Sequence, residues 1–319
     1  MITAPEKSGA VLFYEGNNKL TVVNMYYTKD TVLFLNGKFI KAVDARVDPY
    51  SQTLHYGFGA YEGIRSYQTL NGVKLFKAYE HFERLKNSCS LMGIQLNYDS
   101  QELTQVAYQL LAKNNLTDAY LRPLVFCGPN MRLTQTPDVN LMIGTWKWAK
   151  YHGDKLLKVC VSSFRRPDPA SVRVEGKITG YYVNNILATS EAKSRGYDDA
   201  LMLDLIGNVA AGPAGNFFME KDGVLYTAPL GNIFPGITRQ VVMSICQQLD
   251  IPLVERNINP HELESADSAF LCGTAVDIAG IESIDANTFK KDWKDSLGAI
   301  VQEAYRCQVL ERSFSYVII

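Results

Sequence analysis

Apolar residues along the chain fall into short runs bounded by turn-forming residues, which is typical of β-strands. Residues 31–35 and 38–40 form two such runs, and Asn36-Gly37 between them favours a type I′ turn. Further strands are predicted at residues 73–76, 119–127, 139–148, 157–164, 200–203, 216–220, 224–227 and 268–272.

Helices are predicted where apolar residues recur at intervals of three and four positions. One helix spans about residues 79–92, and another begins after Asp99, which stands before Glu102 in the spacing of a capping box. Further helices are predicted from Lys177 to about Arg195, after Pro235–Thr238, and at residues 292–309.

Both halves of the chain mix strands and helices without regular βαβ alternation, so we predict an α+β fold rather than a doubly wound sheet. The polar segment Tyr151–Lys155 separates two strand-like runs and marks a domain boundary. The expected units are an N-terminal extension at residues 1–30, a small α+β domain at 31–150 and a larger α+β cofactor-binding domain at 151–319. Within the extension, residues 11–14 and 20–23 predict either a short hairpin or a peripheral arm.

The 319 residues carry a formal net charge of −1, from 32 Lys and Arg against 33 Asp and Glu. This balance gives no electrostatic attraction to nucleic acid or to an anionic membrane. The sequence has no run of about 18 apolar residues and does not begin with a secretory signal, so we expect a cytoplasmic protein without a membrane span. Its six cysteines include no CxxC pair and its four histidines lie far apart, so neither a disulfide framework nor a metal site is predicted.

Six short motifs occur in order along the chain, and together they resemble one enzyme family. They are Leu54–Gly57 with Glu62–Arg65, His81–Leu85, Ala119–Leu124, Gly176-Lys177 through Ala192, Pro235–Arg239, and Gly273–Ala275. A chain with these motifs is similar to branched-chain amino-acid aminotransferases, which are fold type IV pyridoxal-phosphate enzymes. The resemblance implies a two-domain, D-amino-acid aminotransferase-like fold, pyridoxal 5′-phosphate as cofactor, and a homodimer or higher homo-oligomer whose pockets are completed by the neighbouring subunit.

The resemblance implies that Lys177 is the catalytic residue, which forms a Schiff base with the cofactor and then moves a proton at the substrate α-carbon. The cofactor phosphate is expected at Arg84 and at the start of a helix, where the N–H groups of Ile237 and Thr238 attract an anion. The other cofactor-binding residues that it implies are Tyr182, Gly273 and Thr274. Without the motifs, Lys177 would be a solvated loop charge and Thr238 an N-cap.

The same resemblance implies transamination of leucine, isoleucine and valine with 2-oxoglutarate as the amino acceptor. Its pocket-wall positions are the aromatic residues Tyr56, Tyr61, Trp148 and Tyr151, which suit branched aliphatic side chains. Its carboxylate-binding positions are Arg65, Tyr120 and Arg122, and Ala275 is a further substrate position. Judged alone, each of these aromatic residues would belong to the protein core.

The sequence departs from the family at Ala211, where relatives carry a glutamate that bonds the protonated pyridine nitrogen of the cofactor. Losing such a charge-assisted hydrogen bond costs roughly 1.5–3 kcal/mol. Three hypotheses follow. We favour a branched-chain aminotransferase with slowed or altered activity. The others are a different fold type IV activity, such as aminodeoxychorismate lyase or D-amino-acid aminotransferase, and a cofactor-binding relative with weak or no activity.

Overall fold

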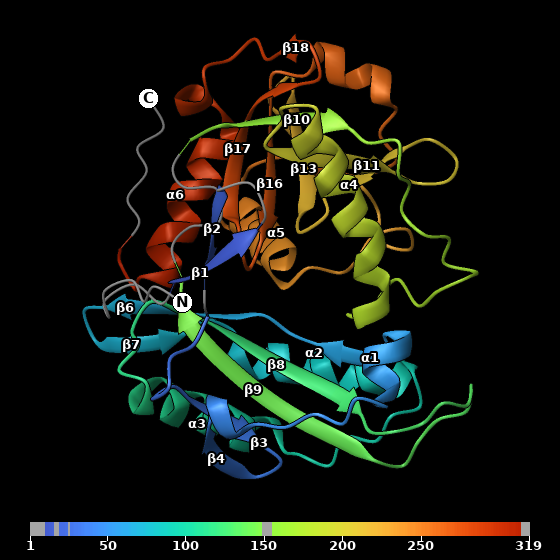
Figure 1. The fold of residues 1–319 in the computed structure, drawn as a ribbon. Helices are drawn as coiled ribbons and strands as arrows, with labels where there is room; N and C mark the ends of the chain where they lie inside the picture. The colour runs from blue at the N-terminus through green and yellow to red at the C-terminus, as the bar shows by residue number, and fades with distance from the viewer. Residues whose placement is uncertain (1–9, 16–18, 25, 149–154, 314–319) are drawn as a thin grey trace.

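The computed structural model describes residues 10–15, 19–24, 26–148 and 155–313, which form two large sheets with helices packed against them (Figure 1). Near the N-terminus, β1 (Ala10–Glu15) and β2 (Lys19–Asn24) pair antiparallel, so the hairpin alternative is the one observed. The predicted boundary at residues 151–155 lies outside the described residues, apart from Lys155.

The first sheet is antiparallel and has seven strands in the order β4-β3-β9-β8-β6-β7, with β5 paired to β8. Its strands are β3 (Val32–Leu35), β4 (Lys38–Lys41), β5 (Gly59–Tyr61), β6 (Ile64–Thr69), β7 (Gly72–Leu75), β8 (Ala119–Cys127) and β9 (Val139–Lys147). Asn36 and Gly37 have φ values of 47° and 86°, as the predicted type I′ turn requires.

Three helices belong to this sheet: α1 (Gln52–Tyr56), α2 (Ala78–Leu91) and α3 (Ser100–Lys113). The apolar stripes of α2 and α3 pack against β8 and β9 in one hydrophobic core (Figure 1). Asp99 is the N-cap of α3, because its carboxylate accepts from the N–H groups of Gln101 and Glu102. This packing fixes the position of α2, whose inner face carries functional side chains.

The second sheet has nine strands in the order β12-β11-β10-β17-β16-β13-β14-β15, with β18 paired to β17. Its strands are β10 (Leu157–Val161), β11 (Asp199–Leu203), β12 (Val209–Ala211), β13 (Asn216–Lys221), β14 (Val224–Thr227), β15 (Leu253–Glu255), β16 (Ser268–Gly273), β17 (Asp277–Ile284) and β18 (Asn287–Thr288). β12 also pairs with β13, so the sheet curls back on itself. Parallel and antiparallel pairs are mixed, and the predicted α+β class is confirmed.

Three helices, α4 (Tyr182–Ser194), α5 (Ile237–Gln248) and α6 (Leu297–Val309), pack against this second sheet. α6 begins later than predicted, because Ser296 caps it by accepting from the N–H of Ala299. Residues 293–295 before it form a 3-10 turn instead. Among the described residues, no helix is long and apolar enough to cross a membrane.

The segment before α4 is attached to the first sheet, although it leads into the second. Ile178 belongs to the core of the first sheet and forms an antiparallel bridge with Ala60. The N–H of Tyr61 donates to the carbonyl of Lys177 at 3.0 Å. Lys177 is therefore held at the junction of the two sheets.

Candidate active site

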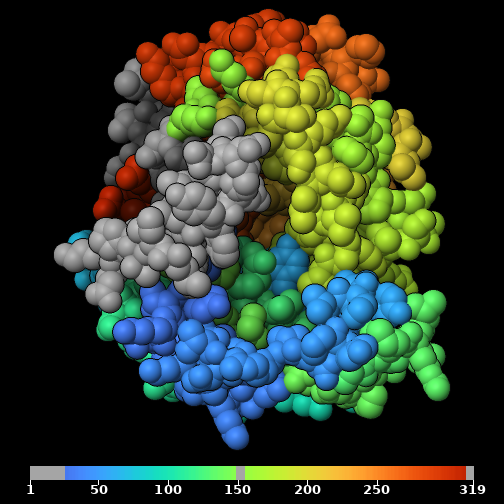
Figure 2. Space-filling model, viewed as in Figure 1, coloured from blue at the N-terminus to red at the C-terminus, as the bar shows by residue number. Residues whose placement is uncertain are grey.

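A cavity of about 360 Å³ lies between the two sheets, within the range of small-molecule sites of roughly 300–1,000 Å³. Figure 2 shows the hollow between the segment coloured blue to green and the segment coloured yellow. Strands β5, β8 and β16, the α4 region and the start of α5 all contribute lining residues. Among the described residues, no group of three His, Cys, Asp or Glu side chains could hold a metal ion.

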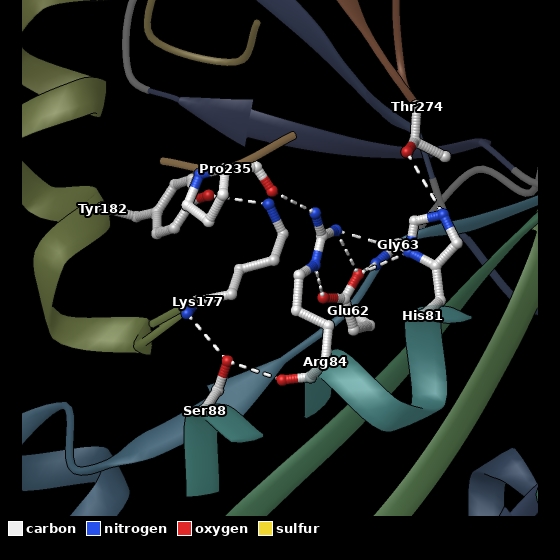
Figure 3. A network of polar contacts seen from close by, with 9 residues as sticks. All are labelled: Glu62, Gly63, His81, Arg84, Ser88, Lys177, Tyr182, Pro235 and Thr274. Carbon is white, nitrogen blue, oxygen red and sulfur yellow. Dashed lines mark hydrogen bonds and ion pairs between the residues drawn. The ribbon is translucent and has the colours of Figure 1, made fainter. Parts of the chain in front are cut away.

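Lys177 points into this cavity from the segment before α4. Its Nζ donates to the hydroxyl of Tyr182 at 2.7 Å, and its backbone N–H donates to Ser88 Oγ at 3.0 Å (Figure 3). The ring centroids of Tyr61 and Phe234 lie 5.0 and 4.8 Å from Nζ. Burial raises the pKa of Tyr182, but the charge and hydrogen bond of Lys177, together with Tyr61 and Arg166, lower it by more, so this pKa lies below that of an ordinary tyrosine.

Arg84 enters the cavity from α2 and is fixed by a buried carboxylate. Its Nε and Nη2 donate to the two oxygens of Glu62 at 2.6 and 2.9 Å, and its Nη1 donates to the carbonyl of Pro235 at 3.0 Å. Glu62 also contacts His81 Nδ1 at 2.7 Å, and His81 Nε2 lies 3.5 Å from the Thr274 hydroxyl (Figure 3). One polar network therefore connects Arg84 with Thr274.

The protonation states of this network follow from its burial and charges. Burial raises the pKa of Glu62, but Arg84 and His81 lower it by more, so the pKa lies well below the usual range and Glu62 is a carboxylate. Burial lowers the pKa of His81. A neutral His81 donates from Nδ1 to Glu62 and leaves Nε2 as the acceptor for Thr274.

The start of α5 faces the same cavity. Gly236 is its N-cap and offers no side-chain acceptor, so the first N–H groups of the helix, which include those of Ile237 and Thr238, stay available to an anion. Thr238 lies inside the helix and is not the N-cap. Gly273 ends β16, and it lines the cavity together with Thr274 and Ala275.

Aromatic rings and one arginine form the other wall of the cavity. Tyr61, Tyr120 and Trp148 line it, and the Arg122 guanidinium lies 4.5 Å from the ring centroid of Tyr61. Gly63 is required here, because a Cβ at this position would lie 1.7 Å from the Tyr120 hydroxyl oxygen. This wall combines apolar faces with a guanidinium.

Two predicted substrate residues do not line the cavity, and a third lies outside the described residues. Tyr56 is exposed at the end of α1, where its hydroxyl donates to the carbonyl of Met131. Tyr151 lies outside the described residues. Arg65 is buried, but its Nη1 donates to Asp277 Oδ2 at 2.8 Å, away from the cavity lining. The carboxylate-binding role expected for Arg65 is therefore corrected to an ion pair between β6 and β17.

This correction can be tested with Arg65→Met, which keeps the length of the side chain and removes its charge. Because the ion pair is largely buried, we expect the free energy of unfolding to fall by about 3 kcal/mol in denaturant titrations. KM for the oxo-acid acceptor should stay near the wild-type value. Arg195→Met, which breaks the exposed pair with Asp285, is the control and should change stability little. Unchanged stability with a raised KM would restore the carboxylate-binding role.

Several residues that line the cavity or lie directly behind its lining were not identified from the sequence. Glu62 and His81 lie within quoted motifs, but neither was given a role, because their contacts join segments far apart in the chain. Arg166 lies in a loop with prolines at positions 167 and 169, where the sequence has no periodicity that would place its side chain, and Asn185 lies on α4. Ala211 ends β12 and lines the cavity, as its match to a cofactor-contacting position suggested.

Comparison with known proteins places these features in one family. The family model described as Amino-transferase class IV matches residues 59–284. The branched-chain-amino-acid aminotransferase of Pseudomonas aeruginosa is 35% identical over 283 residues, which cover 87% of this chain and 92% of that protein. The crystal structure of the Escherichia coli branched-chain amino acid aminotransferase has a TM-score of 0.87 at 31% identity, covering 90% of this chain and 97% of that chain.

A third similar structure carries the cofactor. The branched-chain amino acid aminotransferase of Thermobaculum terrenum in its PLP-bound holo-form has a TM-score of 0.83 at 28% identity, covering 89% of this chain and 95% of that chain. The two-domain fold type expected from the motifs is thereby confirmed. The chain belongs to the class IV aminotransferases, enzymes that use pyridoxal 5′-phosphate.

Proposed function

We propose that this aminotransferase moves the amino group of leucine, isoleucine or valine to 2-oxoglutarate, with Lys177 as the catalytic residue. The observation that carries the proposal is the meeting in one cavity of a lysine amine, an anion-binding helix start and an aromatic wall with a guanidinium. The relatives that match over most of the chain are branched-chain aminotransferases, which supports this class of substrate.

The donor set of the cavity fits pyridoxal phosphate. Its phosphate dianion suits the Arg84 guanidinium and the uncapped N–H groups at the start of α5. Its phenolic oxygen suits the hydroxyl of Tyr182, whose own pKa is lowered by Lys177. Lys177 would hold the cofactor covalently, and the bound cofactor would supply an electron sink for the bond that breaks at the substrate α-carbon.

The residues of the chain position the reaction and move the proton. Lys177 is the lysine among the described lining residues, and once its amine is free it takes up and returns the proton of the α-carbon. Tyr182 and the rings of Tyr61 and Phe234 limit the space open to Nζ.

The opposite wall selects the substrate. Tyr61 and Trp148 offer apolar ring faces to a branched aliphatic side chain. Arg122 has a buried Nε without a partner among the described residues, so it can still donate to a carboxylate. Because Tyr120 adds a hydroxyl beside it, the same pocket can take the second carboxylate of a glutamate or 2-oxoglutarate molecule.

We also propose a homodimer, in which an exposed apolar patch forms the contact. The patch consists of Tyr50, Leu54, Tyr56, Met131 and Leu133. Leu133→Asp should yield a smaller species in sedimentation velocity, whereas Leu70→Asp, equally exposed on the β6–β7 turn, should not. An unchanged sedimenting species for Leu133→Asp would exclude this patch as the dimer contact.

The six cysteines are all buried and unpaired, which suits a reducing cytoplasm.

The substrate proposal is tested by mixing the holoenzyme with L-leucine and 2-oxoglutarate and measuring the branched 2-oxo acid and glutamate. Both products should appear in equal amounts. Turnover of D-alanine without turnover of L-leucine would assign a different class IV activity. A holoenzyme that transfers no amino group from any amino acid would overturn the enzymatic proposal and leave a cofactor-binding protein.

A further inference from the structure

The cavity is rich in positive charge, and its described lining residues include no carboxylate. The cationic lining residues are Arg84, Arg122, Arg166 and Lys177. Glu62 lies behind Arg84, outside the lining, and compensates its charge. Arg166 is different, because none of the described acidic side chains forms an ion pair with it and burial lowers its pKa. A guanidinium without a carboxylate is therefore kept beside the cofactor site.

Arg166 belongs to what we call the cavity floor, formed by Arg166, Asn185, Ala211 and Pro213. The Arg166 side chain is more than nine-tenths buried, its Nη1 donates to Asn185 Oδ1 at 3.3 Å, and its Nε has no partner among the described residues. Asn185 in turn donates to the carbonyl of Pro213 at 2.6 Å. The floor thus keeps one buried donor without a partner among the described residues.

The floor includes Ala211, which occupies the position where relatives carry the glutamate that bonds the pyridine nitrogen of the cofactor. In pyridoxal phosphate the aldehyde carbon bonds the lysine, and the ring nitrogen is opposite the ring carbon that carries this aldehyde. The phosphate arm is on the neighbouring ring carbon. Lys177, Tyr182, the start of α5 and Ala211 at the end of β12 all line this cavity. Ala211 at the end of β12 pairs with Asn216, whose side chain adjoins Gly236 at that helix start.

We propose that the cavity floor holds the pyridine nitrogen unprotonated, with the Arg166 guanidinium as its hydrogen-bond donor in place of an acidic acceptor. This inference rests on the cofactor placement in the proposed function. An unprotonated pyridine nitrogen is an acceptor, whereas a guanidinium has only donors, so the two are complementary. If the nitrogen were protonated, its N–H and the guanidinium N–H would both be donors facing each other without an acceptor. The proton would also add a positive charge beside Arg166.

The methyl group of Ala211 can neither accept a hydrogen bond nor compensate a charge, so it permits this arrangement. The cost of this arrangement is that an unprotonated ring withdraws electrons more weakly than a protonated ring. Ala211→Glu supplies an acceptor at the floor and should therefore protonate the nitrogen and speed the first half-reaction about ten- to a hundredfold. Ala211→Gln adds the same bulk without the charge and serves as the matched control.

The experiment uses holoenzyme loaded with cofactor that carries ¹⁵N at the ring nitrogen, observed by ¹⁵N NMR across the neutral pH range. The resonance of an unprotonated pyridine lies far downfield of that of a pyridinium. The wild type and Ala211→Gln should give the downfield position, and Ala211→Glu the upfield one. In Arg166→Gln the resonance should stay unprotonated but move further downfield, because the donated hydrogen bond is weakened.

A pyridinium resonance in the wild type would overturn the proposal. An Arg166→Gln spectrum identical to that of the wild type would overturn the part assigned to Arg166. The readout needs no amino-acid substrate, so it is separate from the test of the proposed function. If leucine is not turned over but the resonance is downfield, the substrate proposal fails and this one stands. If leucine is turned over and the resonance is that of a pyridinium, the reverse holds.

Discussion

Replacement of Lys177 by alanine is expected to abolish covalent retention of the cofactor and to lower kcat by roughly 10²–10⁴-fold or more. Nζ is the reactive amine in the cavity, and Tyr182 and the surrounding rings hold it in place. A methyl group can neither bind the cofactor covalently nor carry the proton. Mass spectrometry after borohydride reduction measures the covalent adduct, and single-turnover kinetics with L-leucine measure the chemical step.

Two further variants separate charge from chemistry at this position. Lys177→Arg keeps a positive charge near Tyr182 but has no reactive amine, so it should also be inactive. Lys193→Ala removes an exposed lysine from helix α4, which follows Lys177, and should retain both adduct and activity. If Lys177→Ala still carried the cofactor on another lysine, the assignment of Lys177 would be wrong.

Glu62→Gln is expected to lower the free energy of unfolding by about 3–5 kcal/mol, because it removes the buried negative charge that Arg84 and His81 share. The shape of the side chain is kept, so the loss reports charge and hydrogen bonding rather than a cavity. Arg84 would lose its bidentate partner, and its guanidinium would no longer be fixed toward the start of α5. Cofactor affinity should therefore fall together with stability.

Denaturant titration of the apoenzyme measures the first effect, and absorbance titration with the cofactor measures the second. Glu80→Gln, on helix α2 with His81 and Arg84, is the control, because its pair with Lys77 is exposed and should contribute less than about 1 kcal/mol. If Glu62→Gln bound the cofactor as tightly as the wild type, the network would have only a structural role. If stability were also unchanged, the network would not be an ion pair at all.

Much of the strand pattern could be predicted from local sequence. The ends of β8 and β14 agree with their apolar runs, because polar or turn-forming residues bound both. β17 was missed, because Ala279 and Gly280 interrupt its apolar character and residues on both of its faces are buried. In a strand buried on both faces, the alternation that marks most strands is absent.

The cavity could be predicted only in part, since a motif identifies residue types but not the direction of each side chain. Lys177 and Thr274 line the cavity as their motifs suggested. Arg65 occupies a matching position too, yet its partner is Asp277, 212 residues away in sequence. Arg166 lies in a loop without periodicity, and its burial depends on helix α4 packing above it. Such contacts are set by tertiary structure.

The attachment of the Lys177 segment to the first sheet has a mechanical consequence. Lys177 is tied to that sheet through Tyr61 and through Ser88, whereas the helix start at Ile237 belongs to the second sheet. A molecule bonded to Lys177 and anchored at α5 therefore spans the junction like a crosslink. Any rotation of one sheet relative to the other would stretch it. Loading the cofactor should thus couple the two halves, so that they unfold as a single cooperative unit.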